Sequence, residues 1–350
     1  MMQLQRCISF IRMNRKTYII AELSANHNHD FDLAVKTIEA MAEAGADAVK
    51  IQTYTPDSLV MDVDNEYFGP IKGGLWDGIK RYDLYKVGML PYEWQPKLQK
   101  VATDLGMDFF STPFDIEGVD FLEKMNVPKY KIASFEINDI PLIRYVAQKH
   151  KPIIISTGVG DEEDIRLALE TCYQEGNHDV SLLKCTSEYP ATYDQANLLT
   201  IPDMKERFGV QVGVSDHTMG SLVPTVAVAL GAEIVEKHFI LSRSCGGPDS
   251  AFSMEPKEFR DMVDRIRDVE KVLGKVSYEI TDRQRQKRRS LYAKQDINKG
   301  DVFSVENVGS FRPGFGLSPR YWDNLVGVVS QRDISKGDII TMKDLAEYQQ

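Results

Sequence analysis

The sequence has few cysteines and no long apolar run, and these absences exclude several classes of protein. Its four cysteines, Cys7, Cys172, Cys185 and Cys245, lie at scattered spacings that match neither a disulfide framework nor a zinc site. We interpret all four as reduced residues without a functional role. No apolar run approaches the roughly 18 residues of a membrane span, and the N-terminus lacks the apolar core and cleavage site of a secretory signal. We therefore expect a cytoplasmic protein without a membrane partner.

Basic residues are also in deficit. The 42 lysines and arginines face 52 aspartates and glutamates, which gives a formal net charge of −10. Because phosphate backbones are bound by an excess of positive charge, this balance argues against a nucleic-acid partner. The short basic run "TDRQRQKRRS" (281–290) is more typical of a solvated linker in so acidic a chain. An anionic substrate would have to be bound by individual lysines.

Short β-branched segments alternate with helical patterns from Tyr18 onward, which is typical of repeated βα units. No G-x-G-x-x-G follows the first of these segments, so an open dinucleotide-binding sheet is disfavoured. The pattern predicts a (β/α)8 TIM barrel over residues 17–275, with residues 53–90 forming a loop over its mouth. The expected strands are residues 18–23, 48–52, 108–112, 130–134, 152–157, 180–186, 210–216 and 233–239.

The remainder of the chain divides into three parts. Residues 1–16 form an N-terminal extension, in which Met13 is an alternative start, and residues 276–289 form a linker. Residues 290–350 contain a repeat, because "DINKGDVFSVENV" (296–308) and "DISKGDIITMKDL" (333–345) align without a gap. Lys-Gly-Asp is a turn signal, so each copy predicts a strand, a turn and a strand. These residues are expected to form a small β domain.

Polar residues end all eight expected strands, and in a TIM barrel these ends meet at one mouth. A single serine or threonine there is equally consistent with helix capping, but a buried lysine without a partner is costly. Several lysines with hydroxyls predict a phosphorylated small substrate. The residues concerned are Glu22, Lys50, Gln52, Ser111, Thr112, Lys131, Ser134, Glu136, Ser156, Thr157, Lys184, Thr186, Ser187, Ser215, Asp216, His217, Lys237 and His238.

His217 and His238 end adjacent strands and are candidates for a shared divalent metal. Two imidazoles without a thiolate suit Mn²⁺ first, with Co²⁺, Fe²⁺ or Mg²⁺ as alternatives, and such an ion would polarise a carbonyl oxygen. His27 and His29 belong either to this site or to the loop after the first strand. Glu22 and Glu136 are suited to proton transfer or hydroxyl binding, and equally to ion pairs with Lys50 or Lys131.

These residues lie in motifs that resemble the sialic acid synthase family from about Tyr18 to Leu345. The motifs include "IAELSANHN", "GADAVKIQTY", "STPFD", "YKIASFEINDIPLI", "LLKCTSEYP", "VGVSDHT", "EKHF", "GGPDSAFSMEP" and "FRPGFGLSP". Within that family, "QTYTPDSL", "LWDG" and "YDLYK" are most similar to pseudaminic acid synthases. The repeated C-terminal segment resembles the family's antifreeze-like (SAF) domain.

The resemblance implies a role for each site residue. His217 and His238 would bind the metal, and Glu22 or Glu136 would carry the proton. Arg312 of "FRPG" would reach the sugar in the barrel of a second subunit, in a domain-swapped homodimer. Family members often carry asparagine where this chain has Ser187. Phosphoenolpyruvate would be bound by Lys50, Thr112, Lys131, Ser134, Ser156, Ser187 and Ser215, and the sugar by Gln52, Tyr189, Asp249 and Arg312, with Glu22 and Glu136 facing it.

The implied reaction joins phosphoenolpyruvate to 2,4-diacetamido-2,4,6-trideoxy-L-altrose and gives pseudaminic acid and phosphate. N-acetylneuraminate or legionaminate synthesis is the alternative within the family. A metal-dependent or Schiff-base barrel aldolase is a more distant alternative, and a non-catalytic sugar-binding protein is a third.

Overall fold

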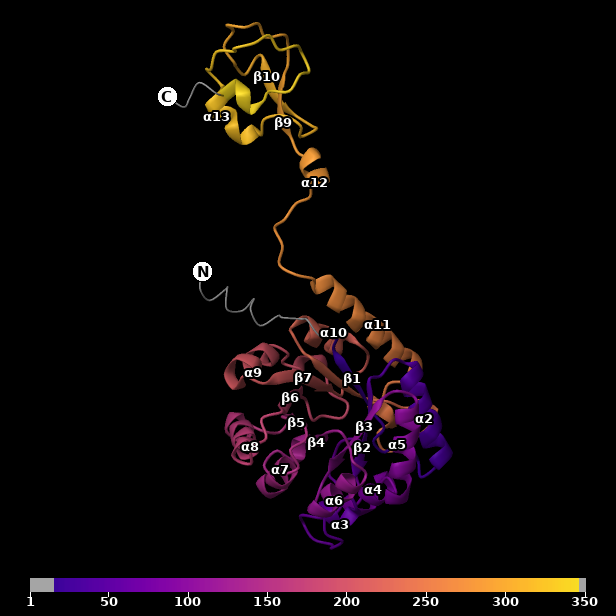
Figure 1. Cartoon of the computed structure of the whole chain (residues 1–350). Coiled ribbons are helices and arrows are strands. Elements are labelled where there is room, and N and C mark those ends of the chain that lie inside the picture. Colours follow the sequence, from indigo (N-terminus) through magenta and orange to yellow (C-terminus); the bar gives the residue numbers. More distant parts are fainter. Residues whose placement is uncertain (1–15, 346–350) are drawn as a thin grey trace. The chain divides into compact units, whose positions relative to one another are not determined.

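The computed structural model describes residues 16–345, in which eight parallel strands close into a barrel (Figure 1). Each strand pairs with the next along the chain, and β1 closes the ring by pairing with β8, Glu22 opposite His238. All eight strands predicted from the sequence are present, so the predicted barrel is confirmed. Their bounds are β1 (Tyr18–Glu22), β2 (Ala48–Thr53), β3 (Asp108–Pro113), β4 (Tyr130–Ile132), β5 (Ile153–Ser156), β6 (Val180–Cys185), β7 (Gln211–Asp216) and β8 (Ile234–His238).

Helices surround the barrel and bury one face each against it (Figure 1). In α2, for example, Ala34, Ile38 and Met41 are fully buried, which is the spacing of one helical face. Asp30 begins this helix by accepting a hydrogen bond from the Leu33 amide. The main helices are α2 (Phe31–Glu43), α5 (Gln95–Asp104), α6 (Ile116–Lys124), α7 (Ile140–Ala147), α8 (Glu162–Gln174), α9 (Thr200–Phe208), α10 (Leu222–Ala229) and α11 (Pro256–Leu273).

The segment between β2 and α5 is partly helical, whereas the sequence predicted a loop. It contains α3 (Pro56–Leu59) and α4 (Arg81–Gly88), and an isolated bridge joins Pro70 to Lys80. His27 Nε2 lies 3.3 Å from the Gly88 carbonyl, and His29 Nε2 lies 3.3 Å from the Lys86 carbonyl. The two histidines therefore belong to the loop after β1, where they hold α4 in place.

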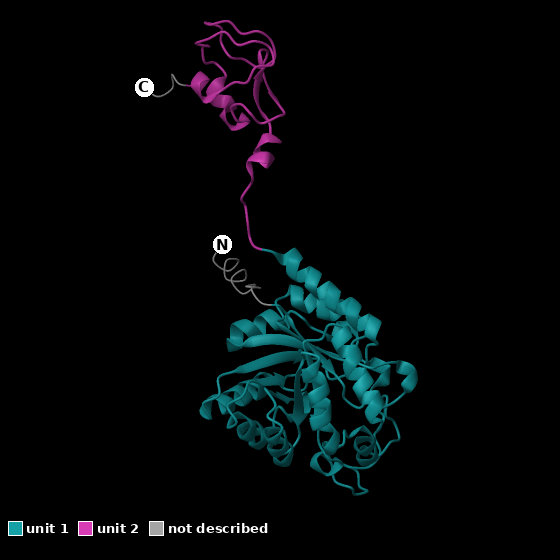
Figure 2. Ribbon diagram, turned by 45° about the vertical axis from the view of Figure 1, so that its right-hand side comes forward, with its two compact units in different colours: residues 1–274 teal, residues 275–350 magenta. Residues whose placement is uncertain are grey.

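The chain divides into two compact units after Gly274 (Figure 2). The second unit begins with residues 275–289, all of them exposed, which include the short helix α12 (Asp282–Gln286). It then forms a two-stranded sheet of β9 (Ser290–Ala293) and β10 (Val308–Phe311), followed by α13 (Trp322–Leu325). Leu291, Phe303, Leu325 and Ile340 are among the residues of its separate hydrophobic core.

The two repeat copies pair with each other about a pseudo-twofold axis. Ile297 and Ile334, which are equivalent in the two copies, exchange two backbone hydrogen bonds of 2.8 Å. Asp333 accepts from the Lys299 amide at 2.7 Å, and Asp296 accepts from the Lys336 amide at 2.8 Å. Within the described part of the copies these contacts are isolated bridges with turns, so the prediction of a complete strand, turn and strand in each copy is only partly correct.

Within residues 16–345, no helix is both long enough and apolar enough to cross a membrane.

Candidate active site

A buried charge network lies inside the barrel, contributed by β1, β2, β4 and β8. Lys50 Nζ lies 2.5 Å from Glu22 Oε2, and both Lys50 and Lys131 lie 3.9 Å from Glu236 Oε1. Each of these four residues is at most 5% exposed. The alternative of an ion pair between Glu22 and Lys50 is therefore realised. Glu236 was not assigned a role from the sequence, although it precedes His238 by two positions and shares its side of the strand.

Hydroxyl groups surround the two lysines. Lys131 donates to Ser156 Oγ at 2.6 Å, Lys50 to Thr112 Oγ1 at 3.4 Å, and Ser215 donates to Glu236 at 3.0 Å. The Gly158 amide donates to Ser134 Oγ at 3.1 Å. A Cβ on Gly158 would lie 2.2 Å from Ser187 Oγ and 2.9 Å from Ser134 Oγ, so a larger residue here would displace these hydroxyls. The predicted phosphoenolpyruvate residues are thus brought to one place.

Burial and mutual contacts set the charges of this network. Burial raises the pKa of Glu22 to about 7, against the attraction of Lys50. Burial also tends to raise the pKa of Glu236, but the attraction of Lys131 and Lys50 outweighs burial and holds this pKa below the usual range. Burial lowers the pKa of Lys131, whereas for Lys50 the effect of burial is outweighed by Glu22 and Glu236, which raise its pKa. Two ammonium groups therefore face one firmly ionised carboxylate, and the excess positive charge favours binding of an anion.

His217 and His238 lie together at the ends of β7 and β8, with ring centroids 5.2 Å apart. His217 Nδ1 lies 2.8 Å from the Thr186 carbonyl and donates a proton to it. Burial tends to lower the pKa of His217, but the hydrogen bond and charge of Cys185 outweigh burial and raise it. His238 Nδ1 is buried without a hydrogen-bond partner, and burial and the neighbouring cations, His217 first, hold its pKa well below the usual range. The two rings are adjacent, and when both are neutral they suit a divalent ion. Within residues 16–345 no group of three or more His, Cys, Asp or Glu residues has metal-binding geometry, so substrate or water oxygens would complete the shell.

The predicted sugar residues of the barrel gather beside the histidines. Ser24 Oγ donates to Asp249 at 2.5 Å and accepts from Gln52 at 3.1 Å, which links the first two strands to the loop after β8. The ring of Tyr189 lies 4.5 Å from that of His217. Ser24 was not predicted as a site residue. Its position in "ELSANHN", just beyond the polar end of β1, could have indicated it. Arg312 belongs to the second unit, after β10, and its role stays a prediction.

Glu136 follows β4 in a short 3-10 helix, Ser134–Glu136. Its Oε2 atom is buried without a hydrogen-bond partner, and among the described residues no cation lies within ion-pairing distance of its carboxylate. Burial raises its pKa to about 7, although Lys131 opposes the shift. The alternative of an ion pair between Glu136 and Lys131 is therefore not realised, and the carboxyl group is free to act on a ligand.

Four predicted mouth residues do not join this network, because side chains alternate along a strand. Lys237 donates to Asp216 Oδ2 at 2.5 Å. Both residues are one position away from site residues of their own strands, so their side chains point to the other face of the sheet. Ser111 contacts Thr53, which in turn contacts Gln95 of the outer helix α5. Lys184 donates to the Cys185 carbonyl at 2.8 Å and to Thr186. Predicting these residues as part of the mouth was wrong.

Cys185 lies beside the site residues, although it was not predicted there. Cys172, Cys185 and Cys245 are free thiols, whereas Cys7 lies outside the described residues. The Cys185 thiol is 4% exposed and lies 3.7 Å from Ser187 Oγ. Burial tends to raise its pKa, but His217 outweighs burial and brings it to about 7. Cys185 is therefore a free thiol, as predicted, and it lies among the site residues, which the sequence did not predict.

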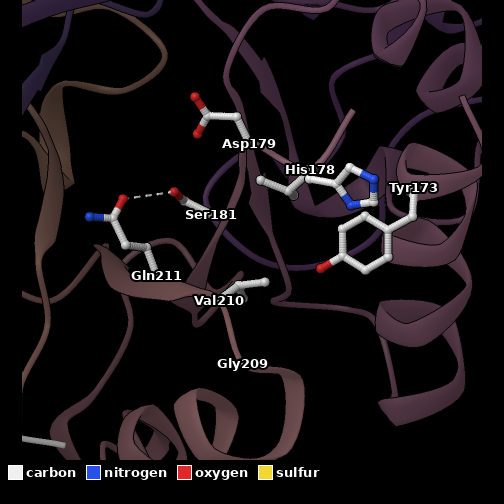
Figure 3. A pocket seen from close by; sticks show the side chains of 8 residues that line it. Tyr173, His178, Asp179, Ser181, Gly209, Val210 and Gln211 are labelled. Atoms are coloured by element: carbon white, nitrogen blue, oxygen red, sulfur yellow. Dashed lines mark hydrogen bonds between the residues drawn. The ribbon is translucent and has the colours of Figure 1, made fainter. Parts of the chain in front are cut away.

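A pocket, shown from close by in Figure 3, is lined by residues from the amino-terminal ends of strands, opposite to the site described above. It measures about 410 Å³ and is lined by residues at the start of β6 and β7, among them His178, Asp179 and Val180. Ser181 donates to Gln211 across it at 3.2 Å. It contains none of the predicted site residues, and the amino-terminal face of a TIM barrel serves stability and not catalysis.

Comparison with known proteins identifies the family of this site. The NeuB family profile matches residues 37–278, and the SAF domain profile matches residues 288–346. The chain belongs to the NeuB family. This NeuB chain is 47% identical to "Pseudaminic acid synthase" of Campylobacter jejuni, over 92% of this chain and 94% of that protein. It is 39% identical to "N,N'-diacetyllegionaminic acid synthase" of Legionella pneumophila, over 89% of each chain.

Solved structures agree with this placement. An N-acetylneuraminic acid synthetase from Leptospira borgpetersenii, crystallised with citrate, superimposes with a TM-score of 0.70 at 31% identity, over 77% of this chain and 90% of that one. The barrel and the SAF domain of the present chain are therefore those of the NeuB family, and its relatives are named synthases of nonulosonic acids.

Proposed function

We propose that this enzyme condenses phosphoenolpyruvate with 2,4-diacetamido-2,4,6-trideoxy-L-altrose to give pseudaminic acid and phosphate. The observation that carries the proposal is the hydroxyl-lined pair Lys50 and Lys131 beside His217 and His238. A carboxylate and a phosphate on one small molecule suit two buried ammonium groups. The identity of 47% to a pseudaminic acid synthase, against 39% to a legionaminic acid synthase, supports the choice of sugar.

The geometry suggests how the reaction would proceed. Lys50 and Lys131 would hold phosphoenolpyruvate, and Ser134, Ser156 and Ser187 would donate to its oxygens. A divalent ion held by His217 and His238 would supply Lewis-acid polarisation of the sugar aldehyde. C3 of phosphoenolpyruvate attacks the aldehyde carbon, a new C–C bond forms, and the aldehyde oxygen takes up a proton. Water adds to C2 and loses one proton, and the C2–O bond to phosphate then breaks while the new hydroxyl gives up its remaining proton to leave the ketone.

Proton transfer in this scheme falls to the two carboxyls whose pKa burial raises to about 7, Glu22 and Glu136. Oε1 of Glu22 and Oε2 of Glu136 are buried without hydrogen-bond partners, so each has a free position for a substrate proton. Glu236 stays ionised between the lysines and would orient the attacking water.

A Schiff-base aldolase is the second candidate, because burial lowers the pKa of Lys131 and a neutral amine is a nucleophile. The hydrogen bond of Lys131 to Ser156 and its attraction to Glu236 favour anion binding instead. Borohydride trapping with pyruvate separates the two reactions, since only the aldolase would yield a covalent adduct on Lys131.

The decisive experiment measures phosphate release from phosphoenolpyruvate in the presence of Mn²⁺. We expect release only when the diacetamido sugar is present, with a product mass equal to pseudaminic acid. His217→Ala should abolish release while the unfolding temperature stays close to that of the parent protein. Phosphate release without a sugar, or full turnover by His217→Ala, would contradict the proposal.

A further inference from the structure

An apolar groove of about 420 Å³ opens beside the sugar residues, within the first unit. One wall comes from the segment between β2 and α5, and the other from the loop after β8. Leu75, Ile79 and Val87 are 45%, 42% and 54% exposed, although large apolar side chains are usually buried. Among the described residues that line the groove, Asp83 has the one charged side chain. The lining residues are Leu75, Trp76, Ile79, Asp83, Leu84, Val87, Gly247, Pro248, Ser250 and Ala251.

The groove connects to the histidine pair through two aromatic rings. Tyr189 lies 4.5 Å from His217, and Trp76 lies 5.8 Å from Tyr189, between ring centroids. Trp76 itself lines the groove. A sugar with its aldehyde at the histidines would therefore extend along Tyr189 and reach the groove with the carbons farthest from the aldehyde.

Both walls are held in place before any ligand binds. Trp76 Nε1 donates to the Pro248 carbonyl at 3.1 Å and so ties one wall to the other. Asn28 donates to the Cys245 carbonyl at 2.9 Å. Gly247 has a φ of +112°, and a Cβ there would lie 2.6 Å from Asn28 Oδ1, so only glycine fits. A groove fixed in this way can discriminate by shape and polarity.

The chemistry of the lining determines which end group it accepts. Apolar side chains bind a methyl group favourably, whereas a hydroxyl placed there loses its hydrogen bonds to water without replacement. The substituent on C2 lies next to the aldehyde and stays near the histidines, and C6 lies farthest away. We propose that this groove binds the terminal methyl group of a 6-deoxy sugar and selects such sugars against their 6-hydroxy counterparts. The inference rests on the proposed function, since it assigns the specificity of that same site.

The test compares kcat/KM for 2,4-diacetamido-2,4,6-trideoxy-L-altrose and for the same sugar with a 6-hydroxyl, at saturating phosphoenolpyruvate. A hydrophobic pocket discriminates by about 10- to 200-fold for a change of this size, and we expect the parent protein to prefer the deoxy sugar within that range. Val87→Thr and Leu84→Asn keep the branching and the number of heavy atoms of the side chain but add a hydrogen-bonding group. Each should reduce the preference at least about threefold and leave the KM for phosphoenolpyruvate unchanged.

Met61→Gln is the matched control, because Met61 belongs to the same segment, is 63% exposed and does not line the groove. It should keep the preference of the parent protein. If Val87→Thr and Leu84→Asn both turn over and keep the parent preference, the inference is wrong while the proposed function stands. The same holds if they alter discrimination at the C4 acetamido group instead. If no amino sugar supports phosphate release, the proposed function itself fails, and the inference with it.

Discussion

Glu236 is the counter-ion of two buried lysines, and this determines how the site responds to an anion. Lys50 and Lys131 both lie 3.9 Å from its Oε1 atom. At that distance each attraction amounts to about 4 kcal/mol for an effective dielectric constant of 20. Glu22 contributes less, because burial raises its pKa to about 7 and leaves it partly protonated at neutral pH. The cluster therefore has more positive than negative charge, and an anionic substrate would supply the missing negative charge.

Glu236→Gln should therefore destabilise the protein and make it depend on phosphate. Removing one partner of a buried ion pair costs about 3 to 5 kcal/mol, because the remaining charges stay buried. Inorganic phosphate should restore much of this stability by binding the two lysines, with a larger rise in unfolding temperature than in the parent protein. Thermal unfolding with and without phosphate measures both effects.

The exposed carboxylate of Glu163 provides the control, since Glu163→Gln should change neither stability nor the response to phosphate. An equal phosphate response in Glu236→Gln and the parent protein would show that the lysines are not the anion site.

Glu136 makes stability depend on pH. Burial raises its pKa to about 7 in the folded protein, against about 4.3 in an unfolded chain. The folded state thus binds this proton more tightly, so the contribution to stability is present below about pH 4.3 and is lost as the pH rises through 7. At about 1.4 kcal/mol per pKa unit, the loss is at most about 3 to 4 kcal/mol.

Glu136→Gln removes that loss. We expect the variant to be more stable than the parent protein at pH 8.5, and to gain much less at pH 5. Urea unfolding at the two pH values measures the difference, and Glu22 contributes equally to both proteins. An equal gain at both pH values would contradict the raised pKa. Turnover should fall in the variant at every pH if Glu136 transfers a proton.

The sequence predicts which residues lie at the end of a strand, but the site contains only those whose side chains point into the barrel. Lys50 and Lys131 were predicted because lysine inside an apolar strand is unusual. Lys237 met the same criterion and was wrong, because the alternation of side chains places it with Asp216 and not with Glu236. Applying that alternation to "EIVEKHF" would have paired Glu236 with His238. The protonation of Glu22 depends on its burial and on the distance to Lys50, and no spacing in the sequence provides either.

At the scale of elements, the two copies of the repeat are joined by two equivalent hydrogen bonds, each from a backbone amide of one copy to an aspartate of the other. Asp296 accepts from the Lys336 amide and Asp333 from the Lys299 amide, at equivalent positions of the two copies. Asp296→Ala should expose the Lys336 amide to hydrogen exchange, and Asp333→Ala the Lys299 amide, each with a loss of about 1 kcal/mol of local stability. Hydrogen exchange of the full chain tests this, with Asp323→Ala as the control. Faster exchange of both amides in both variants would instead indicate unfolding of the whole repeat.

The elements of the barrel were predictable because each strand is a short β-branched segment between helical patterns. The segment between β2 and α5 was not, because its helices are short and are held by tertiary contacts. Gly88 and Lys86 of α4 accept from His27 and His29, which lie far away in the sequence. The repeat was recognised from its alignment, but its two copies pair with each other and form only isolated bridges.

At the scale of the whole molecule, the predicted active site requires both units. Arg312 belongs to the second unit, whereas every other predicted sugar residue belongs to the barrel. The second unit begins with residues 275–289, which are all exposed and rich in lysine and arginine. If Arg312 reaches the sugar in the barrel of a second subunit, the two substrates depend on different parts of the chain. Phosphoenolpyruvate needs the barrel alone, and the sugar needs the second unit as well.

Limited trypsin digestion tests this dependence, since exposed and irregular segments with basic residues are cleaved first. We expect an early cut within residues 275–289 and a barrel fragment that phosphoenolpyruvate still stabilises against heat. If the second unit separates after the cut, turnover of the sugar should be lost, and Arg312→Ala in the uncut chain should raise the KM for the sugar without changing that for phosphoenolpyruvate. Arg320→Ala provides the matched control in the same unit. A purified barrel fragment with full turnover would show that the second unit takes no part in catalysis.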